Sequence, residues 1–177
     1  MSVVINGSAG VTTNSGAVYN GIASGTAVAS TSGTSIDFTS IPSWVKRITV
    51  MFNGVSLSGT SNYIVQIGSG SVDAASYNST SCLAWNSSAS VGASFTTGFG
   101  IVSQSAANSI SGSLTLLNVS GNVWVSNHSI GYNQATSSAG ASGGGNKTLS
   151  GTLDRVRITT VNGTDTFDAG SINILYE

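Results

Sequence analysis

Large apolar side chains recur at every second residue in this chain, in short runs that end at Gly, Ser or Asn. The clearest run is residues 44–52, where one face is apolar and the other polar (Trp44, Ile48, Val50 and Phe52 against Arg47 and Thr49). No segment holds a 3.6-residue period over ten or more positions, and helix-forming Lys, Glu and Arg are scarce. The pattern therefore predicts β-strands and excludes long surface helices and coiled coils.

Eight or nine strands are expected between residue 35 and the C-terminus. Their expected ranges are 35–38, 44–52, 63–67, 82–85, 95–102, 114–119, 123–130, 153–161 and 171–176. Turn residues separate them at Asn53-Gly54, Ser120-Gly121-Asn122 and Asn162-Gly163, and the Gly/Ser-rich stretch 137–145 is expected to be a break between strands. This spacing predicts an all-β fold, an antiparallel two-sheet sandwich of jelly-roll type.

Residues 1–33 differ from the rest because they are small and polar, with few bulky side chains. We expect them to form an extended attachment arm that becomes ordered by packing on something else, with contacts from Val3, Ile5, Tyr19 and Ile22. Residues 34–177 are expected to form the sandwich. The first seven residues lack the basic and long apolar regions of a secretory signal peptide, so we expect synthesis in a cytoplasm.

Charge and hydropathy exclude several kinds of partner. The chain has a net charge of −1 and five Lys or Arg residues, so it lacks the basic surface that binds nucleic acid. Its longest run of large apolar side chains is three residues, far short of the ~20 that span a membrane. Its single cysteine, Cys82, precludes a disulfide within the chain. We expect no cofactor, no nucleic acid and no membrane partner.

The residues that carry enzymatic chemistry are few and scattered. His128 is the only histidine, so we expect no two-histidine zinc site, and we expect His128 on a strand surface or at a subunit contact. The segment Gly140-Ala141-Ser142-Gly143-Gly144 matches Gly-x-Ser-x-Gly but lacks the flanking strand and helix of a nucleophile elbow. Asp165 and Asp168 lie in a turn-rich connection and are better explained by turn formation than by calcium binding. The sequence therefore predicts no enzyme and no metal site.

Aromatic residues near Ser- and Asn-rich stretches suggest a sugar-binding surface. The candidates for glycan or receptor contact are Tyr77, Trp85, Trp124 and Tyr132. The alternative is that such rings are core or interface residues, as large aromatics usually are, and we expect Trp44 to be in the core.

Charged residues on the expected strands predict ion pairs. Three arginines alternate outward and are expected, with Asp154, to pair between strands or between subunits (Arg47, Arg155 and Arg157).

Two stretches of the chain resemble a known family. Residues 35–56 (SIDFTSIPSWVKRITVMFNGVS) and residues 153–177, ending DTFDAGSINILYE, are similar to the C-terminal β-sandwich of tailed-bacteriophage tail-fibre and related virion proteins. The opening VINGSAGV also resembles the start of many such chains, whereas residues 57–150 match only in composition. The resemblance implies a homotrimeric virion protein without a catalytic set.

The expected function is that of a short tail fibre or receptor-recognising tip, attached to other virion proteins by its arm and presenting loops to a host surface polysaccharide. A second reading is a capsid decoration protein, or head fibre, which lays its arm across neighbouring subunits. A third, from another class, is a carbohydrate-binding module of a secreted bacterial protein.

Overall fold

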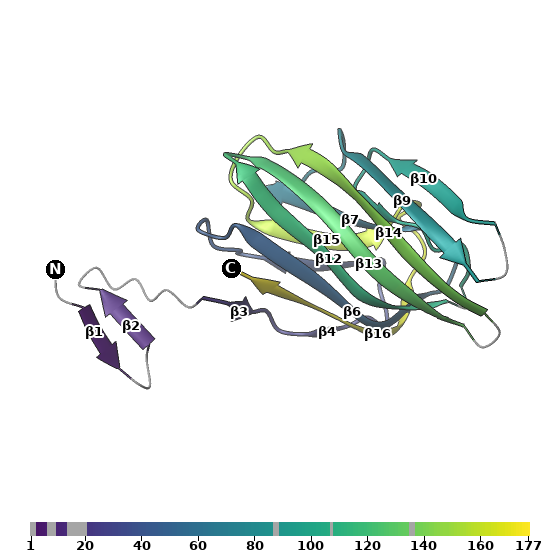
Figure 1. Ribbon diagram of the computed structural model, residues 1–177, viewed down its shortest axis with the longest axis horizontal. Coiled ribbons are helices and arrows are strands. Elements are labelled where there is room, and N and C mark those ends of the chain that lie inside the picture. The colour runs from purple at the N-terminus through teal and green to yellow at the C-terminus, as the bar shows by residue number, and fades with distance from the viewer. Residues whose placement is uncertain (1–2, 7–9, 14–20, 87–88, 107, 135–136) are drawn as a thin grey trace.

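The computed structural model describes residues 3–6, 10–13, 21–86, 89–106, 108–134 and 137–177 (Figure 1). In these ranges the regular structure is entirely β, joined by turns and bends. No helix long and apolar enough to cross a membrane occurs within them.

The larger sheet has nine strands, and all of its pairs are antiparallel. Its order is β10-β9-β14-β13-β12-β6-β16-β3, and β4 also pairs with β16. These strands are β3 (Ala23–Ser24), β4 (Val28–Ala29), β6 (Arg47–Leu57), β9 (Asn78–Trp85), β10 (Val91–Phe95), β12 (Ser109–Ser120), β13 (Val123–Gln134), β14 (Ser137–Thr148) and β16 (Phe167–Tyr176).

The smaller sheet has five antiparallel strands in the order β11-β7-β15-β5, with β8 also paired to β7. They are β5 (Ser35–Thr39), β7 (Tyr63–Ser69), β8 (Ser71–Val72), β11 (Phe99–Ile101) and β15 (Arg155–Thr160). The two sheets enclose one hydrophobic core, to which alternate residues of β6, such as Ile48, Val50 and Phe52, contribute. The predicted all-β antiparallel sandwich is confirmed.

Two sequence predictions about strands are wrong. Residues 95–102 do not form one strand, because the chain bends at 96–98 and passes from β10 in the larger sheet to β11 in the smaller one. The Gly/Ser-rich stretch 137–145 is not a break, because it belongs to β14, between β13 and β9. Glycine is required in β14: a Cβ on Gly143 would lie 2.2 Å from the Thr80 carbonyl oxygen. The residues of β14 therefore form a strand despite their low intrinsic strand propensity, because close packing between neighbouring strands requires them to be small.

The predicted connections agree with the structure in two of three places. Gly121 (φ +50°) lies in the turn between β12 and β13, and Gly163 (φ +68°) in the connection from β15 to β16. Asn53-Gly54 is not a turn, because β6 continues through it to Leu57. Gly54 has a φ of +61° and faces Gly170 of β16 where the register of the two strands shifts, so this pair forms a β-bulge.

The strand ends define two ends of the sandwich (Figure 1). The arm end contains β3, the C-terminal residue Glu177 and the beginning of β6. The loop end contains the connections 58–62 and 161–166 and the described residues 102–106 of a third connection. Because β6 begins at the arm end and finishes at the loop end, the two ends are separated by the full length of that strand.

The described part of the predicted arm lies partly on the sandwich. The backbone N–H groups of Gly25 and Ser30 donate to the carbonyl groups of Ile174 (2.8 Å) and Gly170 (3.0 Å) in β16. Farther toward the N-terminus, β1 (Val3–Asn6) and β2 (Gly10–Thr13) form a hairpin that pairs with no other described strand. The division at residue 33 stays a prediction, with residues 23–30 found along β16.

Candidate functional site

Three of the four predicted glycan contacts are buried. The exposed fractions of Tyr77, Trp124 and Tyr132 are 3%, 3% and 5%. Trp124 and Tyr132 lie on the face of β13 that points into the core, so the prediction of an exposed aromatic surface is wrong for these residues. Trp85 is half-buried at the end of β9, where it packs against the core, and its role in ligand contact stays a prediction.

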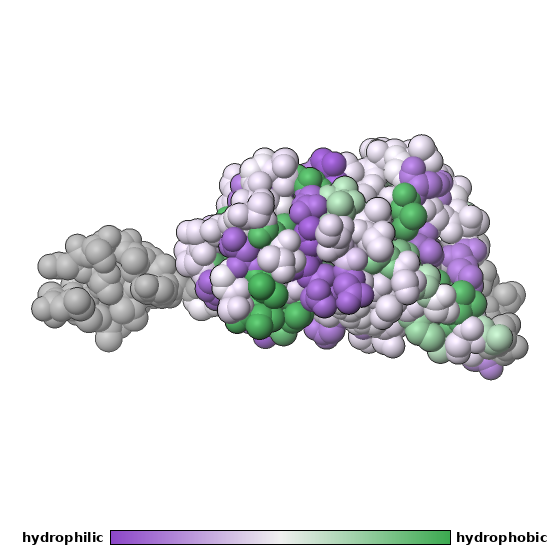
Figure 2. Space-filling view, turned by 90° about the horizontal axis from the view of Figure 1, so that it is seen from above, coloured by the Kyte–Doolittle hydropathy of each residue, from purple (hydrophilic) through white to green (hydrophobic). Residues whose placement is uncertain are grey.

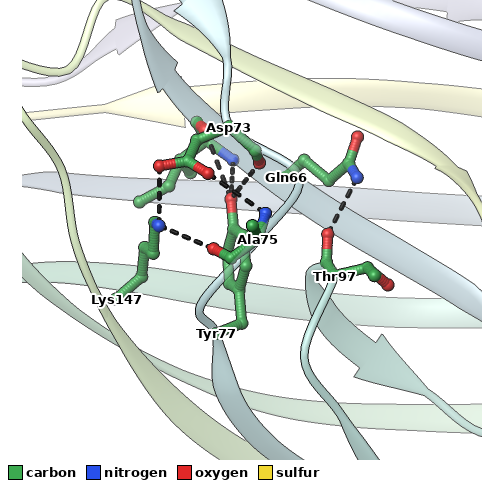
Figure 3. Close-up of polar contacts among 7 residues, drawn as sticks. Gln66, Asp73, Ala75, Tyr77, Thr97 and Lys147 are labelled. Carbon is green, nitrogen blue, oxygen red and sulfur yellow. Dashed lines mark hydrogen bonds and ion pairs between the residues drawn. The ribbon is translucent and has the colours of Figure 1, made fainter.

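Tyr77 and Lys147 form a buried polar cluster inside the sandwich (Figure 3). The Lys147 ammonium, on a side chain that is 4% exposed, lies 2.6 Å from Asp73 Oδ2 and 2.7 Å from the Ala75 carbonyl oxygen. It also lies 5.1 Å from the centre of the Tyr77 ring. The hydrogen bond from Lys147 holds the pKa of the Asp73 carboxyl below its usual value. These contacts clamp residues 73–77 onto β14.

The Tyr77 hydroxyl completes this cluster by joining three backbone groups. It accepts a hydrogen bond from the Ile67 N–H (2.8 Å) and lies 3.2 Å from the Ile67 carbonyl oxygen and 2.9 Å from that of Asp73. Burial raises the pKa of Tyr77, so the hydroxyl stays neutral and is available as a donor. All of these groups are satisfied within the protein, so the cluster is structural.

Trp44 is exposed, whereas the sequence predicted it in the core. Its exposed fraction is 48%, because it lies in the turn after Pro42, before β6 begins. Its ring centre is 6.0 Å from that of Tyr176 at the end of β16. Proline fixes the local backbone and the strand begins only at Arg47, so the alternation of β6 does not extend back to residue 44.

A pocket of about 170 Å³ lies at the arm end, where Tyr176 of this aromatic pair contributes to its lining. Its lining combines apolar, aromatic and charged side chains, including Ile22, Thr49, Leu175 and Tyr176 together with the ion pair between Arg47 and Glu177 (2.9 Å). Ile22 is 63% exposed. Seen from above, the surface of the sandwich carries separate small hydrophobic patches among mostly polar residues (Figure 2). Exposed Trp, Tyr and Arg are the residue types that dominate protein-binding hot spots. We call Ile22, Trp44, Arg47, Leu175, Tyr176 and Glu177 the arm-end patch.

Among the predicted arm contacts, only the side chain of Ile22 is described, and it belongs to the arm-end patch. Tyr19 and the side chains of Val3 and Ile5 lie outside the described residues.

The loop end carries polar loops that are joined by hydrogen bonds. Asp165 Oδ1 accepts from Asn162 Nδ2 (2.7 Å), and Asp165 Oδ2 accepts from the Ser61 N–H (2.9 Å). The Ser61 hydroxyl accepts in turn from the Asn162 N–H (3.2 Å). The hydrogen bond from Asn162 lowers the pKa of the Asp165 carboxyl. A Cβ on Gly59 would lie 2.3 Å from Asp165 Oδ2, so the 58–62 loop needs glycine there.

This network explains Asp165 as a turn residue, as the sequence predicted. Asp168 lies apart from it and accepts a hydrogen bond from the Ser56 hydroxyl. Within the described ranges, no three His, Cys, Asp or Glu residues are grouped to hold a metal ion. The loop end therefore presents ordered polar groups to solvent.

His128 is buried, so the prediction that it lies on a strand surface is wrong. It is 5% exposed, and its Nε2 lies 3.1 Å from Ser81 Oγ. Burial lowers the pKa of His128 to about 4, which keeps the ring neutral at neutral pH. Ser142, the serine of the Gly-x-Ser-x-Gly match, is exposed on the opposite face of the sheet, pairing with Ser129 and Cys82. Ser142 and His128 thus cannot act together.

Ser79 and Ser81 have a structural task that the sequence did not indicate. Their hydroxyl groups accept hydrogen bonds from the backbone N–H groups of Gly100 (3.1 Å) and Val102 (3.2 Å). These donors belong to β11 and the residue that follows it, at an edge of the smaller sheet. The two serines therefore provide hydrogen-bond acceptors for backbone N–H groups at that edge, and they join the two sheets along one side of the sandwich.

The predicted pairing of arginines between strands is confirmed for Arg157. It makes a bidentate pair with Asp37 across β15 and β5 (2.7 and 2.9 Å). Arg155 pairs with its neighbour Asp154 (2.8 Å), so that contact does not cross between strands.

Comparison of this chain with known proteins identified no relative. No family model matches the chain, and neither a curated protein nor a solved structure matches it. The functional inference accordingly depends on the two ends of the sandwich.

Proposed function

We propose that this chain is a non-enzymatic structural protein of a tailed-bacteriophage virion, a short homotrimeric tail-fibre or tip module that binds the host surface through its loop end. The observation that carries this proposal is the opposite placement of the arm and the ordered loops. The N-terminal segment leaves the sandwich beside β3, while the hydrogen-bonded loops 58–62 and 161–166 lie at the other end. A module attached at one end presents its other end outward.

The arm-end patch supports attachment at that end. Trp44 and Ile22 expose large apolar surfaces next to the point where the arm departs, and isolated domains seldom expose such side chains together. The loop end supports recognition, because its polar groups are held in place before any ligand arrives and lose little entropy on binding. Trp85 lies at this end and supplies a partly exposed ring for stacking on a sugar.

The capsid decoration protein remains the second candidate, because an exposed docking patch beside the arm suits either location. Immunogold labelling of phage particles with antibodies to this chain separates the two: label at the tail tip is expected, and label spread over the head favours decoration.

Binding of the purified full-length chain to host cells tests recognition. Trp85→Ala and Thr164→Arg, both at the loop end, are expected to reduce cell binding at least tenfold while circular dichroism stays unchanged. The matched control Trp44→Ala alters the other exposed tryptophan, at the arm end, and is expected to bind cells as the unaltered chain does. Equal binding by all four proteins would refute recognition through the loop end.

A further inference from the structure

The edges of the two sheets differ in how they are protected. In the larger sheet β10 forms one edge and the two-residue strands β3 and β4 form the other, and in the smaller sheet β5 forms one edge and β11 with the two-residue strand β8 forms the other. An unprotected edge offers unpaired backbone N–H and C=O groups to any additional strand. Native proteins block such edges with charges, proline, short strands or covering segments.

Three of these edges are blocked. Edge strand β5 carries Asp37, which is locked in the bidentate pair with Arg157. Edge strand β11 and the residue that follows it donate backbone hydrogen bonds to the hydroxyl groups of Ser79 and Ser81 in the other sheet. Edge strand β3 has only two residues, so it offers almost no backbone for pairing.

Within the described residues, strand β10 has none of these protections. It runs from Val91 to Phe95 without a charged residue or a proline, and it pairs with β9 without a register shift. Its partner strand β9 also has no charged residue, and residues 74–146 of the chain contain no Asp, Glu, Lys or Arg. The outer face of the sheet over β10, β9 and β14 is hollowed and lined by small side chains, among them Thr80, Cys82, Gly92 and Ser94. A strand that pairs with the free edge of β10 would therefore meet no charged side chain on β10 or on its partner β9.

The N-terminal segment of the same chain contains a β-hairpin, β1–β2, that is not part of either sheet of the sandwich. Strands β1 and β2 pair only with each other among the described residues. A two-stranded hairpin alone is marginally stable in water. Residues 1–20 carry no charged side chain, so burying this segment against the uncharged strands β10 and β9 would leave no side-chain ion without solvent.

We propose that the β1–β2 hairpin of one copy adds to strand β10 of a second copy and extends its nine-stranded sheet. The hairpin cannot serve its own β10. Seven inter-strand steps separate β3 from β10 in the sheet order, or ~34 Å at ~4.8 Å per step. The chain from Thr13 to Gly21 reaches at most ~29 Å when fully extended, and it would have to pass around the sheet.

The contact joins two different surfaces, so repeating it produces a closed ring or an open chain of copies. The inference rests on the proposed function only in treating the arm as an attachment segment. It adds that the arm binds another copy of the same protein.

Site-directed crosslinking of the full-length chain tests this pairing. Cys82→Ser removes the native thiol, Ser94→Cys places a thiol on β10, and either Thr12→Cys or Thr13→Cys places one on β2. Because successive strand residues point to opposite faces, one of these two arm positions shares a face with residue 94. A bifunctional thiol reagent spanning ~10 Å, two inter-strand spacings, reaches from β10 to either strand of the hairpin. The matched control replaces Ser94→Cys by Thr39→Cys on the blocked edge β5.

Covalent dimers and larger species are expected with Ser94→Cys, at a yield at least fivefold above that with Thr39→Cys. Equal yields at the two edges, or monomers alone, would overturn the pairing. Hydrogen exchange provides a second test in the unaltered chain. The backbone amides of residues 92–95 are expected to exchange more slowly as protein concentration rises. Thr12→Pro should abolish that slowing. Host-cell binding is measured on the same preparations. Absence of crosslinking with intact cell binding would refute the hairpin contact alone. Crosslinking without cell binding would refute recognition of the host surface alone.

Discussion

His128 Nε2 and Ser81 Oγ lie 3.1 Å apart although their strands are not neighbours in the sheet. Strand β14 runs between them, and the residue in register with both is Gly143. A Cβ on Gly143 would lie 2.6 Å from His128 Cε1. The histidine reaches the serine only because the residue between them has no side chain.

Gly143→Ala is expected to destabilise the fold by about 3 kcal/mol or to prevent folding, because the added methyl group would meet both the histidine ring and the Thr80 carbonyl oxygen. Gly140→Ala is the matched control in the same strand. The nearest atom to a Cβ there is the Ile130 carbonyl oxygen at 3.7 Å, so its effect should stay within about 0.5 kcal/mol. Urea unfolding measures both, and equal midpoints would contradict the packing described for residue 143.

The stability of the protein is expected to depend on pH through His128. The pKa of this group is about 4 in the folded chain, against an ordinary value of 6.5. Because the unfolded chain binds the proton more readily, the free energy of unfolding is highest above pH 6.5 and falls by up to about 3 kcal/mol as the pH drops to 4. Chemical denaturation between pH 7 and 5 measures the slope, and His128→Gln should remove it. A variant with an unchanged slope would show that other groups cause it.

Asp73→Asn is expected to destabilise the protein more than Lys147→Met. The first change leaves a buried ammonium without its carboxylate and should cost about 2 kcal/mol, whereas the second removes the buried charge and keeps a side chain of similar length. We expect Lys147→Met to cost about 1 kcal/mol or less. For comparison, Arg157→Ala breaks a more exposed pair and should cost about 0.5 kcal/mol. Thermal unfolding of the three variants gives the order, and a larger loss from Lys147→Met would contradict it.

Single serine substitutions are expected to act on single amide groups of the smaller sheet. Ser79→Ala removes the acceptor of the Gly100 N–H and should accelerate its hydrogen exchange, while Ser81→Ala should do so for Val102. Ser81→Ala should also cost about 1–3 kcal/mol, because it leaves buried groups without partners. Uniform acceleration of all amides by either variant would indicate global destabilisation instead of loss of the edge contact.

The predictions from sequence were most accurate where one face of a strand meets the core. The alternation around Ile48, Val50 and Phe52 is a direct consequence of the two-residue period of a strand, and it holds in β6. The same two-residue period predicted Trp44 in the core, which is wrong, because Trp44 lies in a turn before the strand begins and its ring does not point to the inner face. It also missed β14, whose glycine and serine residues have no strand propensity and are held by the strands on either side.

The candidate sites depended even more on tertiary contacts. Tyr77, Trp124 and Tyr132 lie in polar stretches of sequence, yet each is buried. Sequence neighbours do not report burial, because in a strand they point to the opposite face. A signal for the arm-end patch was present in Pro42, which marks a turn before Trp44, but the partner Tyr176 comes from the other end of the chain.

The amino-acid sequence by itself determined the class of this fold, because a two-residue hydrophobic period with few helix formers permits only paired strands. Tertiary structure alone decided which polar residues lie inside, which aromatic rings lie outside and which sheet edge stays open. Those properties arise from contacts such as Ser81 with Val102 and Trp44 with Tyr176, which join residues far apart in the chain. Local sequence carries no information about such partners until the sheets have packed.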